Sequence, residues 1–436
     1  MKSTKLERTG WYLFDWGNSA FSTTIVTVFL GPYITVIAKN ASDSAGFIHP
    51  LGIPIFHGSY FSYIISLSVI LQVIFLPWFG AIADFTKSKK TILGIFAYIG
   101  SICSACFYFL EGNNYIFGGV LFVIANLSFG ISVVMYNAYL NDIAEKEETD
   151  SISSKGWAIG YIGGGILLAL NLMLYSNSRQ FGISESYAVR ISLCSAGLWW
   201  GIFTIFPMIW LKVRSSKYPI KRGNYFKIGI NRFIVTMKEL RKYKKTMYFL
   251  IAYLCYNDGI QAVLTMASLF GKEELGLEIE TLLKVILLVQ FIGFFGSLYF
   301  NKIAEIFSTK KAIIVTLIIW NFSIFYAFLF MKTSADFYIL GIIIGFIMGG
   351  TQALSRSMFS QLIPKGNEAE FFSLYEISDK GTSWLAPLLF GLCLQFTNSY
   401  RYAILSLIIF FIIGLLMMFR FNYEKAKEDL VIFTDK

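Results

Sequence analysis

The sequence is poor in charged residues, histidine and cysteine. Of its 436 residues, 15% are charged, two are histidines and five are cysteines, whereas 56% are hydrophobic. Because so few charged side chains cannot cover a soluble fold of this length, the sequence predicts an integral membrane protein. His49 and His57 both fall in one predicted outer loop, and the sequence has no phosphate-binding glycine loop with a Walker lysine. An intramembrane enzyme and an ATP-driven pump are therefore not expected.

The few cysteines predict neither a metal site nor a cofactor. All five lie within apolar segments, and only Cys103 and Cys106 have the CxxC spacing. A structural zinc site needs further ligands, and neither a histidine nor a second cysteine pair accompanies this one. We interpret the cysteines as packing residues of helices.

Long apolar runs are what the sequence has in abundance. A helix needs about 20 apolar residues to cross a membrane, and the first such run shows no signal-peptide cleavage site. Twelve runs qualify, at residues 11–38, 59–83, 89–110, 115–142, 155–175, 190–212, 246–270, 281–304, 311–331, 336–362, 369–396 and 400–421. The sequence thus predicts an all-α fold of twelve transmembrane helices.

One short segment occurs twice. Ile82–Lys90 reads IADFTKSKK, and Ile303–Lys311 reads IAEIFSTKK, 221 positions later. Each copy ends one apolar run and opens the next. This pattern predicts two six-helix pseudo-repeats, residues 1–212 and 246–436, joined by a connector at 213–245.

Basic residues are concentrated in alternate loops. If both ends and every second loop face the cytoplasm, those regions hold 28 of the 37 Lys and Arg, as the positive-inside rule requires. The connector holds eleven of them, with apolar residues at helical spacing. We interpret it as an amphipathic helix on the anionic inner leaflet. A plain basic linker and a binding segment for a cytoplasmic protein are the alternatives, and nucleic acid is not an expected partner.

The first copy of the repeated segment resembles the loop between helices two and three of major facilitator transporters. Gly80 and Asp84 stand four residues apart before a lysine cluster. Phe85 and Lys87 depart from the family pattern, which has a basic residue and a second glycine at these places. The resemblance implies the twelve-helix major facilitator fold.

Further blocks narrow this resemblance to one branch. They are WYLFDWGNSAF at 11–21, YNDG at 256–259, LFGKEELGL at 269–277, GGTQALSRSMFSQLIP at 349–364 and EAEFF at 368–372. Together they resemble the unknown major facilitator family, which includes bacterial proteins and fungal vacuolar amino-acid effluxers linked to autophagy. The resemblance implies a secondary transporter of small polar metabolites, amino acids first. The expected location is a bacterial cytoplasmic membrane, with both termini in the cytoplasm.

Two acids occupy equivalent places in the repeated segment. Asp84 and Glu305 each stand at the cytoplasmic end of a predicted helix. Such an acid can meet a helix N-terminus or a basic residue of the other half, closing that side in one state. We predict a gating role for both. The alternative is a carboxylate exposed in a turn beside lysines.

Asp258 lies near the middle of the seventh predicted helix. An ionised carboxylate there costs several kcal/mol unless it faces water or a partner. Asn257 is its neighbour, and Gln261 and Thr265 lie on its helical face. We predict a site for cargo or for a coupling proton. A packing carboxylate bonded to a neighbouring Tyr or Asn is the alternative.

A polar stripe follows the first predicted helix. It consists of Asp15, Asn18, Ser19, Ser22 and Thr23, at the spacing of one helical face. We expect the stripe to line the central path towards Asp258, with Asn18 and Ser19 as the better cargo contacts. Asp15 is closer to the membrane edge, where it could pair with a connector lysine or act in a gate.

The remaining candidates lie on helices four, ten and eleven. They are Tyr136, Asn137, Asn141, Asp142, Gln352, Ser355, Arg356, Tyr375, Asp379 and Lys380. Arg356 could snorkel to the interface, pair with Asp142 or Asp379 as a gate, or hold a substrate carboxylate. We interpret Asp142, Asp379 and Lys380 as gate residues, and Tyr136, Asn137, Gln352 and Arg356 as contacts to cargo or to a coupling ion.

Glycines recur on two of the predicted helices. Helix five has Gly160, Gly163, Gly164 and Gly165, and helix ten has Gly341, Gly345, Gly349 and Gly350. Such spacing lets helices approach closely. In a carrier these seams can slide, whereas in a static bundle they only tighten the packing. The repeat favours a rocking carrier over a channel. A lipid-handling carrier and a receptor or scaffold derived from a carrier are the remaining alternatives.

Overall fold

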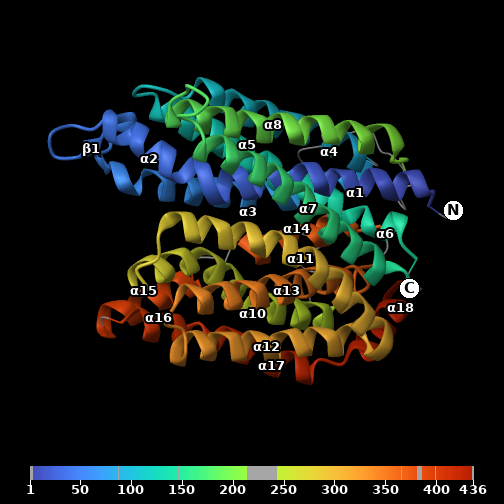
Figure 1. The fold of residues 1–436 in the computed structure, drawn as a ribbon. Coiled ribbons are helices and arrows are strands. Elements are labelled where there is room, and N and C mark those ends of the chain that lie inside the picture. Colours follow the sequence, from blue (N-terminus) through green and yellow to red (C-terminus); the bar gives the residue numbers. More distant parts are fainter. Residues whose placement is uncertain are drawn as a thin grey trace.

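The chain forms two helical bundles that lie against each other (Figure 1). The computed structural model describes residues 3–86, 88–145, 147–213, 243–364, 366–380, 385–397 and 399–434. The amphipathic helix predicted in the connector falls mainly within residues 214–242, outside the described residues. Ten helices of the described chain are long and apolar enough to cross a membrane. The all-α multi-pass membrane fold predicted from the sequence is therefore confirmed.

The first bundle contains six membrane-length segments. They are α1 (Lys5–Ala20) continued by η1 (Phe21–Phe29) and α2 (Leu30–Asn40); α3 (Tyr60–Thr86); α4 (Lys89–Ala105) with η4 (Cys106–Phe109); α5 (Tyr115–Ala138) with α6 (Leu140–Ile143); α7 (Thr149–Ser176); and α8 (Glu185–Trp210).

The second bundle is assembled in the same way. It contains α10 (Lys244–Glu273), α11 (Ile279–Phe307), α12 (Thr309–Leu329), α13 (Ser334–Ser360), α14 (Glu368–Lys380), α15 (Leu385–Thr397), α16 (Tyr400–Ser406), α17 (Ile408–Arg420) and α18 (Tyr423–Thr434). α10 and the pair α14–α15 occupy the places of the seventh and eleventh predicted helices. The described helices are therefore consistent with twelve spans.

The molecule has two distinct ends (Figure 1). At one end, which we term the hairpin end, β1 (Phe47–Ile48) and β2 (Ile55–Phe56) form an antiparallel hairpin with η2 (Pro50–Gly52) and η3 (His57–Ser59). At the other, the terminal end, α1 begins and α18 lies. In the hairpin, the backbone N–H of Phe47 and the imidazole of His49 contact the Asp43 carboxylate and hold its pKa below its ordinary value.

The first membrane helix changes its winding midway. Thr4 and Glu7 cap its start reciprocally, which satisfies backbone donors of the first turn. η1 is a stretch of π-helix, whose turns are wider than those of an α-helix. The polar stripe predicted on a 3.6-residue period therefore does not continue evenly through Ser22 and Thr23.

Close helix approach at glycine is evident in both bundles. In the first bundle, Gly163 of α7 lies against the backbone of Trp16 on α1. In the second, a Cβ added at Gly349 of α13 would meet the carbonyl oxygen of Gly293 and would lie 2.9 Å from the amide nitrogen of Ser297. Since these are backbone atoms of α11, they cannot rotate away as a side chain would.

We expect Gly349→Ala to lower the free energy of unfolding by about 1–3 kcal/mol, because the added methyl group overpacks the α11–α13 contact. The measurement is the thermal unfolding midpoint of the purified protein. Gly391→Ala on α15 is the matched control, since no atom lies within 4 Å of its added Cβ. Equal midpoints for the two variants would contradict the close approach of α11 and α13.

Candidate functional site

Arg356 lies buried between the two bundles. It belongs to α13, and 2% of its surface is exposed. Its Nε donates to Ser153 Oγ at 3.0 Å, and one terminal nitrogen donates to the Ser153 carbonyl at 2.7 Å. The other terminal nitrogen reaches Asn137 Oδ1 at 3.4 Å. These acceptors belong to α7 and α5 of the first bundle, so the guanidinium ties the bundles together and does not snorkel to the membrane surface.

Aromatic rings of the first bundle enclose this guanidinium. The central carbon of Arg356 lies 5.0 Å from the Trp11 ring, 5.5 Å from the Tyr136 ring and 5.3 Å from the Trp157 ring, within cation–π range. Trp11 and Tyr136 stack with centroids 4.3 Å apart, and the Trp11 indole donates to the Tyr136 carbonyl. We call these three residues the aromatic box. It presents its ring faces to a cation of the second bundle.

Asp15 is the acidic partner of this arginine. Its Oδ2 accepts from the Tyr136 hydroxyl at 3.0 Å and lies 3.9 Å from Nη1 of Arg356. A separation of 3.9 Å is beyond hydrogen-bond range, so charge alone attracts the pair. Asp142 and Asp379 were the partners predicted from the sequence. The described ion pair of Arg356 is instead with Asp15.

Two glycines of α7 allow α1 to approach closely, so that Asp15 lies beside Arg356. A Cβ at Gly156 would lie 2.5 Å from the Trp11 ring and 3.0 Å from Arg356 Nη2. A Cβ at Gly160 would lie 3.1 Å from Asp15 Cγ and 2.8 Å from Ser19 Oγ. α1 therefore packs its polar face closely on α7.

Asn137 links Arg356 to a carboxylate that the sequence analysis missed. Its Nδ2 donates to Glu376 Oε1 of α14 at 2.7 Å. Glu376 is buried, and the signal that could have revealed it was an acid inside an apolar run. Asn137 of α5 thus contacts both α13 and α14 of the second bundle.

A further cross-bundle bond lies one turn towards the hairpin end. The Tyr161 hydroxyl of α7 donates to Gln352 Oε1 of α13 at 2.5 Å. Nearby on α1, Asn18 is buried, and its Oδ1 has no hydrogen-bond partner among the described residues. Ser19 lies against α7, as the contact with Gly160 shows. Gln352 and Ser19 were predicted as site residues, whereas Tyr161 was not.

Asp258 lies apart from this cluster. It is 1% exposed, and its Oδ2 accepts from the backbone N–H of Ala386 at 3.2 Å, at the start of α15. Its Oδ1 has no hydrogen-bond partner in the described part of the chain. On the same helix, Thr265 donates to the Gln261 carbonyl and Asn257 is buried. No hydrogen bond or ion pair of the described residues joins Asp258 to Asp15 or Arg356.

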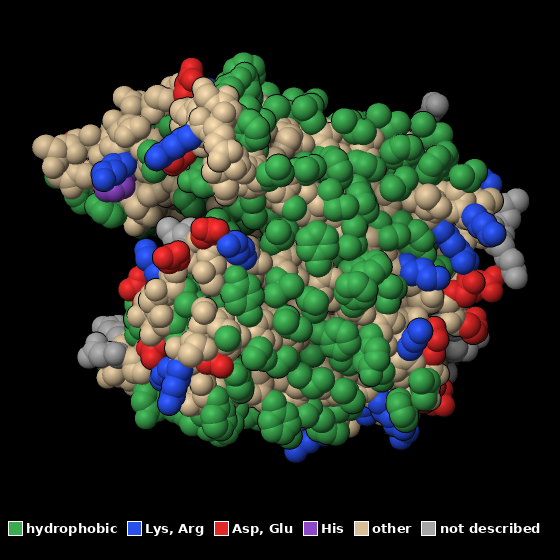
Figure 2. Space-filling model, viewed as in Figure 1, with side chains coloured by type: hydrophobic (Ala, Val, Ile, Leu, Met, Phe, Trp, Pro, Cys, Tyr) green, Lys and Arg blue, Asp and Glu red, His purple; other side chains and the backbone are tan. Residues whose placement is uncertain are grey.

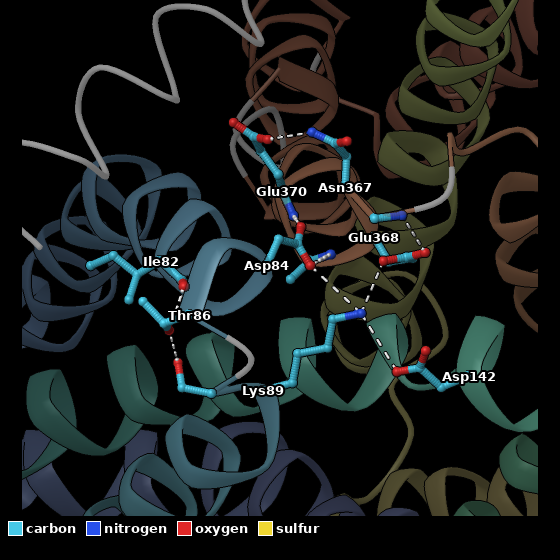
Figure 3. Close-up of polar contacts among 11 residues, drawn as sticks. Ile82, Asp84, Thr86, Lys89, Asp142, Asn367, Glu368 and Glu370 are labelled. Atoms are coloured by element: carbon cyan, nitrogen blue, oxygen red, sulfur yellow. Dashed lines mark hydrogen bonds and ion pairs between the residues drawn. The ribbon is translucent and has the colours of Figure 1, made fainter. Parts of the chain in front are cut away.

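Asp84 caps a helix of the other bundle at the terminal end. Its two carboxylate oxygens accept from the backbone N–H groups of Ala369 at 3.2 Å and Glu370 at 2.9 Å, in the first turn of α14 (Figure 3). The positive end of the helix dipole stabilises a carboxylate there. This is one of the two arrangements that the sequence analysis considered for a gate.

Lys89 adds an ion cluster to this cap (Figure 3). Its Nζ donates to Glu368 at 3.0 Å and lies 3.6 Å from Asp84 and 3.5 Å from Asp142. The lysine side chain is 14% exposed, so water screens these pairs only partly. Asn141 contributes a bond of 3.0 Å to the carbonyl of Ser360. Three carboxylates from α3, α6 and α14 thus meet at one lysine.

The second copy of the repeated segment is built differently. Glu305 is exposed and accepts from Asn301 of its own helix at 2.8 Å. Asp150, in the first turn of α7, accepts from the hydroxyl of Thr309 at 2.5 Å and from the hydroxyl of Ser357. Asp150 was not among the site residues predicted from the sequence. Its only signal in the sequence was an acid in the loop before the helix predicted at residues 155–175.

The other predicted gate residues are on α14. The backbone of Asp379 and Lys380 ends this helix, but their side chains lie outside the described residues. Tyr375 stacks on Tyr253 and Phe359 with centroids 4.2 Å and 5.1 Å apart. It belongs to the core of the second bundle.

The polar contacts between the two bundles are distributed unevenly between the terminal end and the hairpin end. The described cross-bundle hydrogen bonds lie between the terminal end and the level of Tyr161. Figure 2 shows a notch between the bundles at the hairpin end and contact between them towards the terminal end. The described conformation is therefore closed at the terminal end. Among the described residues, no group of three His, Cys, Asp or Glu side chains could hold a metal ion.

Comparisons with known proteins agree with this architecture. The bacterial homologue of the iron transporter ferroportin, in an outward-facing state, superposes with a TM-score of 0.68 at 14% identity, over 96% of this chain and 99% of that one. The proton:xylose symporter XylE gives a TM-score of 0.67 at 14% identity, over 95% and 94%. At such identities these structures support the fold alone.

Sequence relatives cover almost the whole chain. The uncharacterized MFS-type transporter YxiO of Bacillus subtilis is 31% identical over 433 residues, 99% of this chain and 98% of that protein. Autophagy-related protein 22-1 of Penicillium rubens is 25% identical over 547 aligned positions, 98% of this chain and 92% of that protein. The family model described as "Vacuole effluxer Atg22 like" matches residues 3–431. The chain therefore belongs to the Atg22-like family of major facilitator transporters.

Proposed function

We propose that this transporter moves a small zwitterionic metabolite, amino acids first, between two alternating states. The observation that carries the proposal is the meeting of Asp15 and Arg356, opposite charges from the two bundles, inside the aromatic box. The name of the matching family, a vacuole effluxer, is consistent with such a cargo-moving role. The proposed location is a bacterial cytoplasmic membrane, with the terminal end in the cytoplasm.

Opening of the terminal end would separate Asp15 from Arg356. Each charge would then lack its partner in a region of low dielectric constant, which is strongly unfavourable. A zwitterion supplies both replacements at once. Its carboxylate would bind the guanidinium with two parallel hydrogen bonds, and its ammonium group would bind Asp15 and the ring faces of Trp11 and Tyr136. Asn18, Ser19, Asn137 and Gln352 are the proposed polar contacts for the rest of the cargo.

The contacts of Asp84 and Lys89 would close the cytoplasmic side in the described conformation. The cap by Asp84 and the ion cluster at Lys89 must break before α14 can move away from α3. Asp142 takes part as a partner of Lys89. Asp379 and Lys380, at the end of α14, are proposed to act in the same gate, whereas Glu305 is exposed and bonded to Asn301 of its own helix in this conformation.

The test is counterflow of a labelled amino-acid mixture in proteoliposomes, because exchange of cargo needs no knowledge of the driving ion. Saturable exchange is the expected result. Absence of exchange, from protein with a normal thermal unfolding midpoint, would overturn the proposal. Movement of a fluorescent phospholipid instead would identify a lipid carrier, and amino-acid binding without exchange would identify a receptor.

Proton coupling is proposed to depend on Asp258. One oxygen of its buried carboxylate has no hydrogen-bond partner among the described residues, and a proton there would remove an unfavourable charge. We expect Asp258→Asn to retain counterflow within about twofold of wild type and to lose accumulation driven by a pH gradient. Gln261→Asn, which leaves the acid in place, is the control. Normal pH-driven accumulation by Asp258→Asn would contradict this role and leave Asp258 as the cap of α15.

A further inference from the structure

We propose that Asp150, on α7 of the first bundle, has the gating role that the repeat assigns to Glu305 of the second bundle. The inference rests on the alternating access proposed above and names a residue of its machinery. Its test needs no cargo, so it can fail separately from the proposed substrate.

The two copies of the repeated segment predict symmetric gates. Asp84 aligns with Glu305, and Ser88 aligns with Thr309. Asp84 caps the first turn of α14 in the opposite bundle. By symmetry, Glu305 would cap the first turn of α7, because α7 is the helix of the first bundle that packs against α11 and α13.

In the structure, the acid of this second contact lies on α7 and its partners lie in the second bundle, the reverse of what the repeat predicts. Glu305 is exposed and bonded to Asn301 on its own helix. The acid that reaches across the boundary belongs to α7 itself. Asp150 accepts from Thr309 at 2.5 Å and from Ser357, so it joins α7 to α12 and to α13. Asp84 and Asp150 therefore both lie in the first bundle, whereas Glu368 of the second bundle accepts from Lys89 of the first.

The two gates also differ in chemistry. Asp84 has two backbone donors and Lys89 nearby, whereas the described hydrogen-bond donors of Asp150 are two hydroxyls, and the charges of Lys427 and Glu305 act on it in opposite directions. Water can replace hydroxyl donors at a carboxylate, and Thr309 lies at the start of its helix, at the terminal end. The α7 gate can therefore exchange its partners for water at lower free energy than the α14 gate. We expect the α7 gate to open first.

The position of Asp150 connects this gate to the Asp15–Arg356 site. Ser153 lies one turn along α7 from Asp150, and Ser357 is the next residue after Arg356. Asp150 therefore holds together the same two helices, α7 and α13, that Ser153 and Arg356 join. Separation of these helices must break the Asp150 contacts and release the guanidinium in one movement.

Hydrogen–deuterium exchange of the purified full-length protein tests the assignment without cargo. We expect Asp150→Ala to speed exchange roughly tenfold in peptides from the starts of α7 and α12, while the start of α14 stays protected. Asp84→Ala should show the converse pattern. Glu305→Ala is the matched control and should leave all three regions unchanged.

Two outcomes would overturn the proposal. One is unchanged exchange at α7 and α12 in Asp150→Ala, and the other is an equal acceleration in Glu305→Ala. If Asp150→Ala does not fold, the double variant Thr309→Val, Ser357→Ala removes the same hydrogen bonds and takes its place.

A purely local role, such as stabilising the first turn of α7, makes a different prediction. The variant Ala353→Cys, in a background without the five native cysteines, places one thiol on α13, farther from the terminal end than Ser357. The backbone carbonyl of Ala353 accepts a hydrogen bond from Ser153 of α7. We expect Asp150→Ala to raise the labelling rate of this thiol by a membrane-permeant maleimide at least fivefold. An unchanged labelling rate would restrict Asp150 to its own helix and refute the gating role.

Discussion

Arg356→Gln is expected to lower counterflow at least about a hundredfold. Removal of one partner from a buried ion pair typically costs 3–5 kcal/mol, because the other charge stays buried and unpaired. Here that charge is Asp15, which would keep only the Tyr136 hydroxyl as a described partner. Arg356→Lys is expected to rescue little, since an ammonium group cannot reach Ser153 and Asn137 together as the planar guanidinium does.

The double variant Asp15→Asn, Arg356→Gln separates stability from recognition. If the pair only stabilises the fold, removal of both charges should restore the unfolding midpoint and also transport. If the pair binds cargo, the midpoint should recover while counterflow stays near background. Wild-type exchange in the double variant would contradict the proposed role of this pair in binding.

Asp84→Asn is expected to reduce transport roughly tenfold while amino-acid binding changes less than about threefold. The amide keeps the shape of the side chain but removes the charge that caps α14 and attracts Lys89. Hydrogen bonds to a charged group contribute about 1.5–3 kcal/mol, so the closed terminal end would lose much of its stabilisation. Counterflow and equilibrium binding on the same preparation measure the two effects.

Glu305→Gln provides the control for this variant. Glu305 occupies the equivalent place in the repeat but is exposed in the structure. It is expected to transport within about twofold of wild type. Unchanged transport in Asp84→Asn would refute its gating role, and a loss confined to binding would place Asp84 in the cargo site instead.

The fold could be predicted from the sequence because length and hydropathy determine where a helix can cross a membrane. The chemistry of Asp84 was predictable for a related reason, since an acid at a helix end has few kinds of partner. Asp258 could also be placed at the middle of its helix. Each of these predictions depended only on how deep a residue lies in the membrane. The position of a residue within its apolar run gives this depth directly.

The partners of individual charges were harder to predict, because they depend on which faces of two helices meet. Arg356 was considered beside Asp142 or Asp379, but the tight approach of α1 to Gly156 and Gly160 brings Asp15 to it instead. Asp142 forms an ion pair with Lys89 instead. The π-helical turns of η1 also shift the angular position of later residues, so a stripe drawn on an α-helical period ends near Phe21. None of these features has a signal in hydropathy.

The uneven distribution of cross-bundle hydrogen bonds makes the two faces of the carrier unequal as binding surfaces. Polar contacts hold the terminal end shut, so a ligand arriving there binds only the small fraction of molecules that has opened. Its apparent dissociation constant is the intrinsic value divided by that fraction. A ligand arriving at the hairpin end does not have to break these cross-bundle contacts of the terminal end. One binding site will therefore have two measured affinities, and the ratio between them reports the free energy that the closed end stores.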